Sequence, residues 1–177
     1  MTELILERRF DPPLTTANVM AQAETSEGCF GIYRVDWRQS FLSADGRRLA
    51  CWLVAPDAES ARLALRQSGV GEHVIWPATV HDAADAGAPS WRSANVAVSR
   101  RWEEPVVLDD IQAIEDAGAG CLATHQVRFA RTYFATDRRR MLCLYQAPDA
   151  EAVRNAQRQA GMPVESVWAF RPVRDLA

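Results

Sequence analysis

Three polar residues, His125, Arg131 and Tyr133, are separated by even numbers of positions in a stretch that is otherwise mostly apolar. Alternate residues of a β-strand point to the same side, so a strand over 125–135 places these side chains on one face. Polar groups that converge in an aromatic pocket are the usual pattern of a ligand site. We therefore predict that this face binds a small ligand, with Arg131 as the charge partner of an anionic group. Two other roles for Arg131 stay open, namely an ion pair across a sheet interface and exposure to solvent.

An earlier stretch extends the predicted site with Trp37, Gln39 and Trp52. The Asp-Gly pair at 45–46 is a strong signal for a hairpin turn, and a tight turn there pairs Gln39 with Trp52. Strand alternation then places Trp37 on the same face. We expect this aromatic face to look into the space between two sheets.

An internal duplication positions both stretches. Residues 8–80 align with residues 100–172 at a constant offset of 92 without a gap, and 22 of the 73 pairs are identical. The segments 51–62 and 143–154 share the pattern Cys-x-x-x-Ala-Pro-Asp-Ala-Glu. A repeat of this length indicates two copies of one supersecondary unit.

Each copy is predicted to fold in the order strand, helix, strand, strand, helix, strand, which is the ferredoxin-like unit. In the first copy we expect strands at 4–10, 33–42, 48–54 and 74–80, with helices from Thr15 or Thr16 to about Gly28 and from Asp57 to Gly69. In the second copy we expect strands at 95–102, 125–135, 139–146 and 165–172, with helices at 108–119 and 149–161.

The predicted fold class is therefore α+β, with two tandem ferredoxin-like repeats at 1–80 and 95–177 and a linker at 81–94. Each sheet must bury an open face, and packing the two sheets together gives a pseudo-twofold dimeric α/β-barrel-like domain. Asp137-Arg138 stands where the first copy has Asp-Gly, so a different hairpin loop is expected there.

The charge balance argues against two classes of partner. The 177 residues have a net charge of −3, with 20 arginines and no lysine. This composition lacks the strongly basic surface expected of a protein that binds nucleic acid or an anionic membrane. No window reaches the roughly 18 apolar residues of a membrane span, and the first residues do not resemble a signal peptide, so we expect a cytoplasmic protein.

No catalytic or metal-binding motif is recognisable in the sequence. We predict that the four cysteines are buried, reduced thiols, with a metal-thiolate role as the minor alternative; they are Cys29, Cys51, Cys121 and Cys143. His73 and His81 flank the fourth strand without the spacing of a ligand pair, so we interpret them as surface residues.

Short patterns in both copies carry a family resemblance: Trp37-x-x-Ser40-Phe41-x-Ser43-x-Asp45, then Cys51 and Ala55-Pro56-Asp57-x-Glu59, and Gly161-Met162-Pro163 with Arg171-Pro172-Val173. They resemble the small bacterial nickel-binding domains of otherwise unknown function. The resemblance implies a ferredoxin-like fold, a homodimer and nickel as a possible bound metal. A His that the family usually places two residues after the strand Trp is replaced here by Gln39 and, in the second copy, by Arg131.

The sequence thus predicts a non-catalytic protein that binds a small ligand or, in the manner of the nickel-binding family, a metal ion. The alternative is a small α+β-barrel enzyme, monooxygenase-like or isomerase-like, that acts on an anionic molecule between the sheets. In that hypothesis His125 is the acid or base and Arg131 holds the substrate carboxylate. A third possibility is a paralogue that has kept only a role in assembly.

Overall fold

Two compact units, each containing strands and helices, make up the chain. The computed structural model describes residues 1–84 and 87–173. Of the described residues, unit 1 contains Met1–Ala78 together with 171–173, and unit 2 contains those between Thr79 and Phe170. Residues 85 and 86 of the predicted linker, and residues 174–177 of the predicted second repeat, lie outside the described residues.

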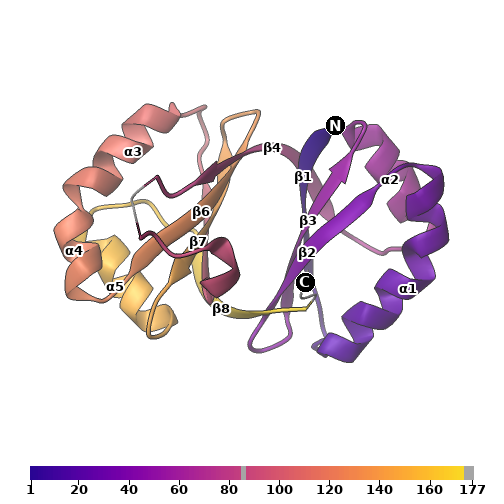
Figure 1. The fold of residues 1–177 in the computed structure, drawn as a ribbon, viewed down its shortest axis with the longest axis horizontal. Helices are drawn as coiled ribbons and strands as arrows, with labels where there is room; N and C mark the ends of the chain where they lie inside the picture. The colour runs from indigo at the N-terminus through magenta and orange to yellow at the C-terminus, as the bar shows by residue number, and fades with distance from the viewer. Residues whose placement is uncertain (85–86, 174–177) are drawn as a thin grey trace. The chain divides into compact units, whose positions relative to one another are not determined.

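Unit 1 has the element order β1 (Thr2–Arg9), α1 (Thr16–Ile32), β2 (Asp36–Ser43), β3 (Arg48–Ala55), α2 (Ala58–Gln67) and β4 (Val74–Asp82). The last four residues of β4, from Thr79 to Asp82, belong to unit 2. β1 pairs antiparallel with both β3 and β4, and β2 pairs antiparallel with β3. The strand order is therefore β4-β1-β3-β2. Both helices cover one face of this sheet (Figure 1).

Local sequence signals set the ends of these elements. Thr15 caps α1 in a reciprocal capping box with Asn18, and Asp57 caps α2 by accepting a hydrogen bond from the Ser60 amide. Gly46 closes the β2–β3 hairpin at φ +71°, where a Cβ would lie only 2.3 Å from the Leu14 carbonyl oxygen. Glycine is thus required at this turn for both backbone conformation and space.

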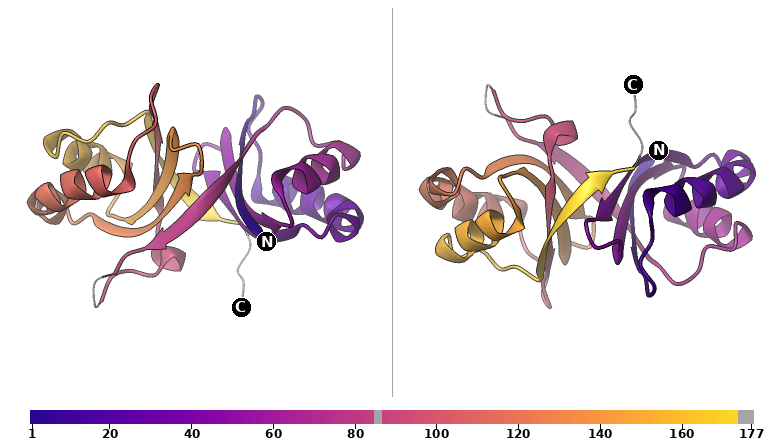
Figure 2. Two further views of the ribbon diagram at one scale, coloured as in Figure 1. Left: turned by 90° about the horizontal axis from the view of Figure 1, so that it is seen from above. Right: turned by 90° about the horizontal axis from the view of Figure 1, so that it is seen from below.

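Unit 2 contains a 3₁₀ turn η1 (Trp91–Ser93), followed by β5 (Val96–Arg101), α3 (Leu108–Ala117), α4 (Ala119–Thr124), β6 (Arg128–Ala135), β7 (Arg140–Gln146), α5 (Ala150–Gln159) and β8 (Ser166–Pro172). β5 pairs antiparallel with β7 and β8, and β6 pairs antiparallel with β7. The views in Figure 2 show the helices on one face of their own sheet. The predicted α+β class with antiparallel, ferredoxin-like strand order is confirmed.

Three local predictions in unit 2 are wrong. The helix expected at 108–119 breaks at Gly118, and a second helix continues to Thr124. The strand expected from 125 begins at Arg128, because Gln126 adopts a left-handed conformation at φ +56°. Arg138 adopts the left-handed conformation at φ +58° and donates its amide to the Ala135 carbonyl, as Gly46 does to Ser43, so the two hairpin loops are alike.

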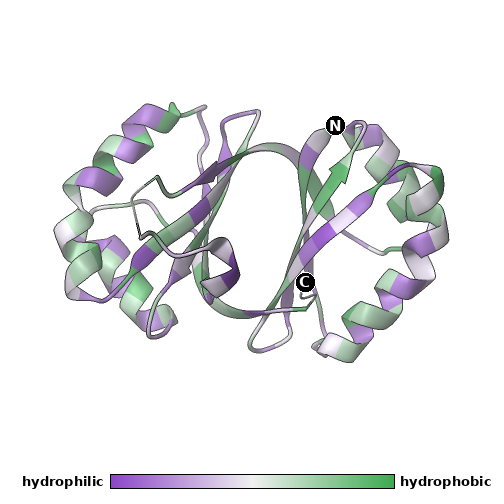
Figure 3. Ribbon diagram, in the orientation of Figure 1, coloured by the Kyte–Doolittle hydropathy of each residue, from purple (hydrophilic) through white to green (hydrophobic). Residues whose placement is uncertain are grey.

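Each unit buries its own apolar cluster between its sheet and its helices. The cluster of unit 1 includes Leu4, Leu6, Leu53 and Leu65, and that of unit 2 includes Val96, Val98, Tyr145 and Val153. Burying one such aliphatic side chain contributes about 1.5–3 kcal/mol. Figure 3 shows green and purple residues alternating along several strands, as expected where the two strand faces differ. No described helix is both long and apolar enough to cross a membrane.

Candidate functional site

The predicted polar face of unit 2 does not form as expected, because His125 is not on the strand. His125 follows α4 as its C-terminal cap, and its Nε2 lies 3.1 Å from Oε1 of Gln159 on α5. Arg131 lies on β6 opposite Leu144 of β7. The structure therefore places His125 in the helix layer and not on the strand that carries Arg131 and Tyr133. The enzymatic hypothesis requires His125 and Arg131 to share one site.

A β-bulge in each unit overturns the predicted position of Trp37. The β2–β3 register shifts between Trp37 and Gln39, and the β6–β7 register shifts between Phe129 and Arg131. A bulge inserts one extra residue into one strand. Two residues on either side of it that would share a face in a regular strand therefore point to opposite faces. Trp37 accordingly packs against the core beneath the helices, on the opposite side of the sheet from Gln39.

The rest of the predicted face in unit 1 has the expected register. Gln39 pairs with Trp52 across β2 and β3, which confirms that prediction. Gln39 is buried, and its side-chain nitrogen donates to the Ser40 carbonyl at 3.2 Å. The Trp52 indole donates to the Glu3 carboxylate. These contacts hold the side chains in place, and whether they bind a ligand stays a prediction.

Arg131 takes one of the roles that the sequence left open, an ion pair with a carboxylate. Its Nε and one terminal nitrogen bind the two carboxylate oxygens of Asp82 at 2.6 and 2.8 Å. The guanidinium also lies over two aromatic rings, 5.1 Å from the centroid of Trp91 and 5.9 Å from that of Tyr133. The hydrogen bond from Arg131 lowers the pKa of Asp82. Arg131 is therefore paired with a carboxylate of this chain, and its role as the charge partner of a ligand stays a prediction.

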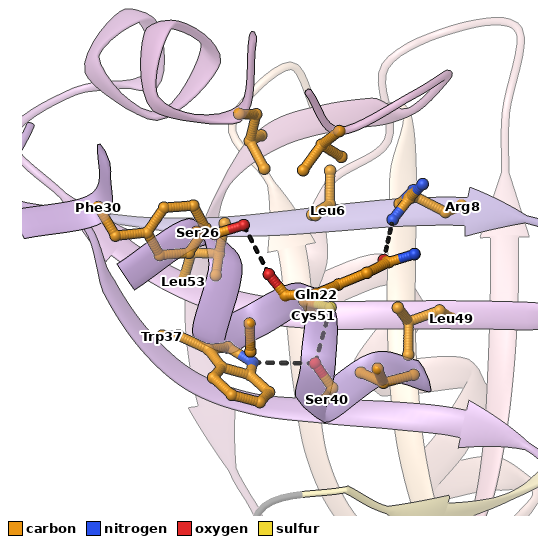
Figure 4. A pocket seen from close by; sticks show the side chains of 14 residues that line it. Leu6, Arg8, Gln22, Ser26, Phe30, Trp37, Ser40, Leu49, Cys51 and Leu53 are labelled. Atoms are coloured by element: carbon orange, nitrogen blue, oxygen red, sulfur yellow. Dashed lines mark hydrogen bonds between the residues drawn. The ribbon is translucent and has the colours of Figure 1, made fainter. Parts of the chain in front are cut away.

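A pocket lies within unit 1 between α1 and the sheet (Figure 4). We call it the Arg8 pocket. Its cavity volume is about 50 Å³, enough for a few water-sized groups. Its lining is mainly apolar, with a few polar side chains: Leu6, Arg8, Val19, Gln22, Ala23, Ser26, Phe30, Trp37, Ser40, Leu49, Cys51, Leu53, Leu65 and Val70.

Arg8 is the charged group of this pocket. It makes one hydrogen bond to a described residue, from a terminal nitrogen to Oε1 of Gln22 on α1 at 2.8 Å, and it stacks on Phe10 with 4.6 Å to the ring centroid. No described carboxylate lies within ion-pair distance of it. Partial burial strips water from the guanidinium and lowers its pKa. Arg8 is thus a partly desolvated cation with donor capacity left over.

The equivalent arginine of unit 2, Arg100, lies in a complete polar network. Its terminal nitrogens donate to Gln157 Oε1 at 2.8 Å, to the Tyr145 hydroxyl at 3.1 Å and to the Pro163 carbonyl at 2.6 Å. Glu115 lies 3.5 Å away and accepts a hydrogen bond from the Tyr145 hydroxyl at 2.9 Å. Burial opposes the charge on Arg100, but the neighbouring groups outweigh it and raise its pKa.

Three substitutions between the repeats account for the difference. At the offset of 92, Glu115, Tyr145 and Gln157 correspond to Ala23, Leu53 and Leu65, which all line the Arg8 pocket. Unit 2 therefore fills with its own side chains the space that remains open in unit 1. The Nε–H groups of both arginines are buried without a hydrogen-bond acceptor, so the contrast lies in the terminal nitrogens.

The cysteine in the pocket is held as a thiol. Ser40 donates to Cys51 Sγ at 2.7 Å, and Trp37 donates to the Ser40 hydroxyl at 2.9 Å (Figure 4). Burial raises the pKa of Cys51 to about 11. A thiol with this pKa is a poor nucleophile at neutral pH. All four cysteines are free and two are buried, Cys51 and Cys143.

The metal donors do not gather. His73 Nδ1 contacts the Gly71 carbonyl, His81 Nε2 contacts the Thr79 hydroxyl, and His125 contacts Gln159. Among residues 1–84 and 87–173, no group of three or more His, Cys, Asp or Glu side chains is arranged to hold a metal ion. The donors of these residues therefore do not fit a nickel centre within one chain, since Ni(II) favours clustered imidazole ligands.

The described lining of the Arg8 pocket contains no His, Asp or Glu. Of its two serines, Ser40 donates to Cys51 Sγ and Ser26 donates to the Gln22 carbonyl. Sequence reasoning placed Trp37 in a site on the opposite face of the sheet, and it missed Arg8 and Ala23. The signal was present in the repeat alignment, where Arg8 and Arg100 are identical while Ala23 faces Glu115.

Two of the solved structures that resemble this chain have TM-scores of 0.50 or more, and these support the fold. A solved structure of SCO4226 from Streptomyces coelicolor A3(2) is 20% identical, covers 42% of this chain and 91% of that chain, and has a TM-score of 0.38. A mutant chlorite dismutase from Candidatus Nitrospira defluvii, in complex with cyanide, is 11% identical over 97% of this chain and 91% of that chain, at a TM-score of 0.51. The putative chlorite dismutase TA0507 is also 11% identical, over 98% and 94%, at 0.50. At these identities the likeness concerns the fold alone.

Family comparison adds one finding. The search of curated proteins gives no match. Residues 98–169, which run from β5 into β8, match one family. The resemblance inferred from the sequence is thereby confirmed: this stretch of the chain resembles the family described as nickel responsive protein SCO4226-like.

Proposed function

We propose that this protein is a non-catalytic small-ligand-binding protein and that the ligand occupies the Arg8 pocket. The observation that carries the proposal is the open space in unit 1 at the place where unit 2 is filled by Glu115, Tyr145 and Gln157. A mainly apolar pocket with a few polar groups is the usual form of a small-molecule site.

An open groove adjoins the pocket. This groove, along the 8–14 segment and α1, shares four lining residues with the pocket, Arg8, Gln22, Ser26 and Val70. A small molecule can therefore reach Arg8 from solvent, and its apolar part can continue towards Leu53 and Leu65.

The test is a titration followed by ¹H–¹⁵N NMR, with butyrate, butan-1-ol and butylamine as probes. At least one probe should cause saturable shifts at the Trp37 indole, which lines the pocket, and not at Trp168 in unit 2. Ala23→Leu should abolish the shifts by filling the cavity, while Ala17→Leu on the exposed side of α1 should retain them. If no probe gives saturable shifts at Trp37, the proposal is wrong.

Nickel is the ligand that the family description suggests, but the described donors of this chain do not support a site for it. Calorimetric titration of untagged protein with Ni(II), Zn(II) and Cu(II) tests this directly. We expect no stoichiometric, selective binding of nickel. A selective nickel site with a defined stoichiometry would instead favour the family's function over the Arg8 pocket.

We also propose that the chain is a tandem duplication and that it forms a homodimer. The division into repeats at 1–80 and 95–177, their origin as a tandem duplication and the homodimer follow from the repeat alignment and the family resemblance. Light scattering coupled to size exclusion measures the assembly: a mass near twice 19.7 kDa supports the dimer, and a mass near 19.7 kDa rejects it.

A further inference from the structure

From the contrast between the two units we infer that the ligand of the Arg8 pocket is a small carboxylic acid with a short apolar tail, bound through its carboxylate to Arg8. This inference rests on the proposed function and names the chemical class of the ligand. The two repeats hold the same arginine on the equivalent strand, and among the described residues a carboxylate of the chain pairs with Arg100 but not with Arg8.

Unit 2 shows what satisfies an arginine at this position. Arg100 is completely buried, and Glu115, with a side chain only 12% exposed, provides the opposite charge. The hydroxyl of Tyr145 and the amide oxygen of Gln157 accept two further hydrogen bonds. The space beside the guanidinium therefore suits a carboxylate together with other acceptors.

In unit 1 the carboxylate is missing but the arginine remains. Ala23 stands at the position of Glu115 and lines the cavity, so a ligand's carboxylate can take the place that the glutamate side chain fills in the other repeat. Charge-assisted hydrogen bonds between guanidinium and carboxylate are among the strongest in proteins. Partial burial has removed part of the hydration of the Arg8 guanidinium, so a ligand's carboxylate has less water to displace when it binds there.

The remaining lining defines the tail. Leu53 and Leu65 replace the polar Tyr145 and Gln157, and Leu6, Leu49 and Phe30 complete an apolar wall. With about 50 Å³ available, the tail has room for only a few carbon atoms. A longer acid would have to extend into the adjoining groove beside Gln22 and Ser26.

Butyrate and butan-1-ol test this directly, because they have the same number of carbon atoms and differ in charge. Wild-type protein should bind butyrate roughly tenfold more tightly than the alcohol in the NMR titration. The preference should weaken with added salt, since part of the interaction is screened. Arg8→Leu should remove the preference, and Arg8→Lys should keep part of it. Arg66→Leu, at an exposed position of α2 outside both the pocket and the groove, removes the same charge and should leave the preference unchanged.

A second pair of variants changes residue 23, which lines the pocket. Ala23→Glu should supply the missing carboxylate and abolish butyrate binding, and Ala23→Ser, which adds little volume and no charge, should retain it. Equal affinity of the wild type for butyrate and butan-1-ol would overturn the carboxylate inference while leaving the proposed function standing. If none of the three probes (butyrate, butan-1-ol and butylamine) binds, both the inference and the proposed function are overturned.

Discussion

The same arginine occurs in both repeats but in opposite electrostatic settings. Arg100 in unit 2 has Glu115, Tyr145 and Gln157 around it, and its pKa is raised. Arg8 in unit 1 has one hydrogen-bond partner among the described residues, Gln22, and its pKa is lowered. The comparison teaches that three neighbouring side chains decide whether the charge of an arginine at this position is satisfied within its own unit.

The largest expected effect comes from breaking the network in unit 2. Glu115→Ala leaves Arg100 buried without its counter-charge, which should destabilise the protein by about 3–5 kcal/mol. Chemical unfolding in urea measures the loss. Glu115→Gln is the matched control, because it can still accept the Tyr145 hydrogen bond and should cost less. Equal stability of Glu115→Ala and wild type would show that Arg100 does not depend on this carboxylate.

A second difference between the repeats lies in their first helices. α1 is continuous through Ser26, whereas the equivalent Gly118 separates α3 from α4. A Cβ at Gly118 would lie 2.5 Å from the Cβ of Ala160 at the end of α5. Gly118→Ala should therefore overpack this contact and cost about 1–3 kcal/mol in thermal or urea unfolding.

Gly120 provides the control for that substitution. A Cβ at Gly120 meets no atom within 4 Å, and Gly120 lies inside α4. Gly120→Ala should stabilise the helix by up to about 1 kcal/mol. If Gly118→Ala also stabilises the protein, close packing of α5 is not the reason for the helix break.

The sequence predicted the order of the elements better than their faces. Strand alternation, the capping residues Thr15 and Asp57 and the Gly46 turn are local signals, and the structure contains the elements they indicate. The bulges beside Gln39 and Arg131 carry no such signal, because an extra residue in one strand leaves composition and periodicity nearly unchanged. Trp37 was therefore assigned to the wrong face.

The site was harder to predict for a related reason. The charged residue of the Arg8 pocket cannot be told from the other arginines when the sequence of the first repeat is considered alone. Only the three-dimensional network around Arg100 shows that positions 23, 53 and 65 surround the guanidinium. The predicted charge partner, Arg131, is occupied by Asp82, which a strand pattern cannot reveal because Asp82 lies 49 residues away in sequence.

Removing the partner of Arg131 gives a third, smaller effect that depends on pH. Asp82→Asn should cost about 1–2 kcal/mol at neutral pH, because the Arg131 side chain is only 8% exposed. This is less than for Glu115, since the Asp82 side chain is 58% exposed and water can replace it. The folded pKa of Asp82 is lowered below 3.8, so the stabilisation is present above that pH and is lost as pH falls through the folded pKa.

Urea unfolding of wild type and Asp82→Asn between pH 7 and pH 2.5 checks this prediction. The difference in unfolding free energy should be constant near neutrality and shrink in acid. A difference that stays the same down to pH 2.5 would mean that the ion pair is not its source.

The smallest expected effect is that of Arg8→Leu, and it tests the comparison most directly. The substitution loses the Gln22 hydrogen bond and the contact with Phe10, but it also removes a partly desolvated charge and adds an apolar group to an apolar pocket. These contributions oppose each other, so stability should change by less than about 1 kcal/mol. Arg100→Leu in the same assay should cost several times as much, because it leaves Glu115 buried without its partner. Equal losses for the two variants would mean that Arg8, like Arg100, serves the stability of the fold, and unit 1 would then have no arginine to spare for a ligand.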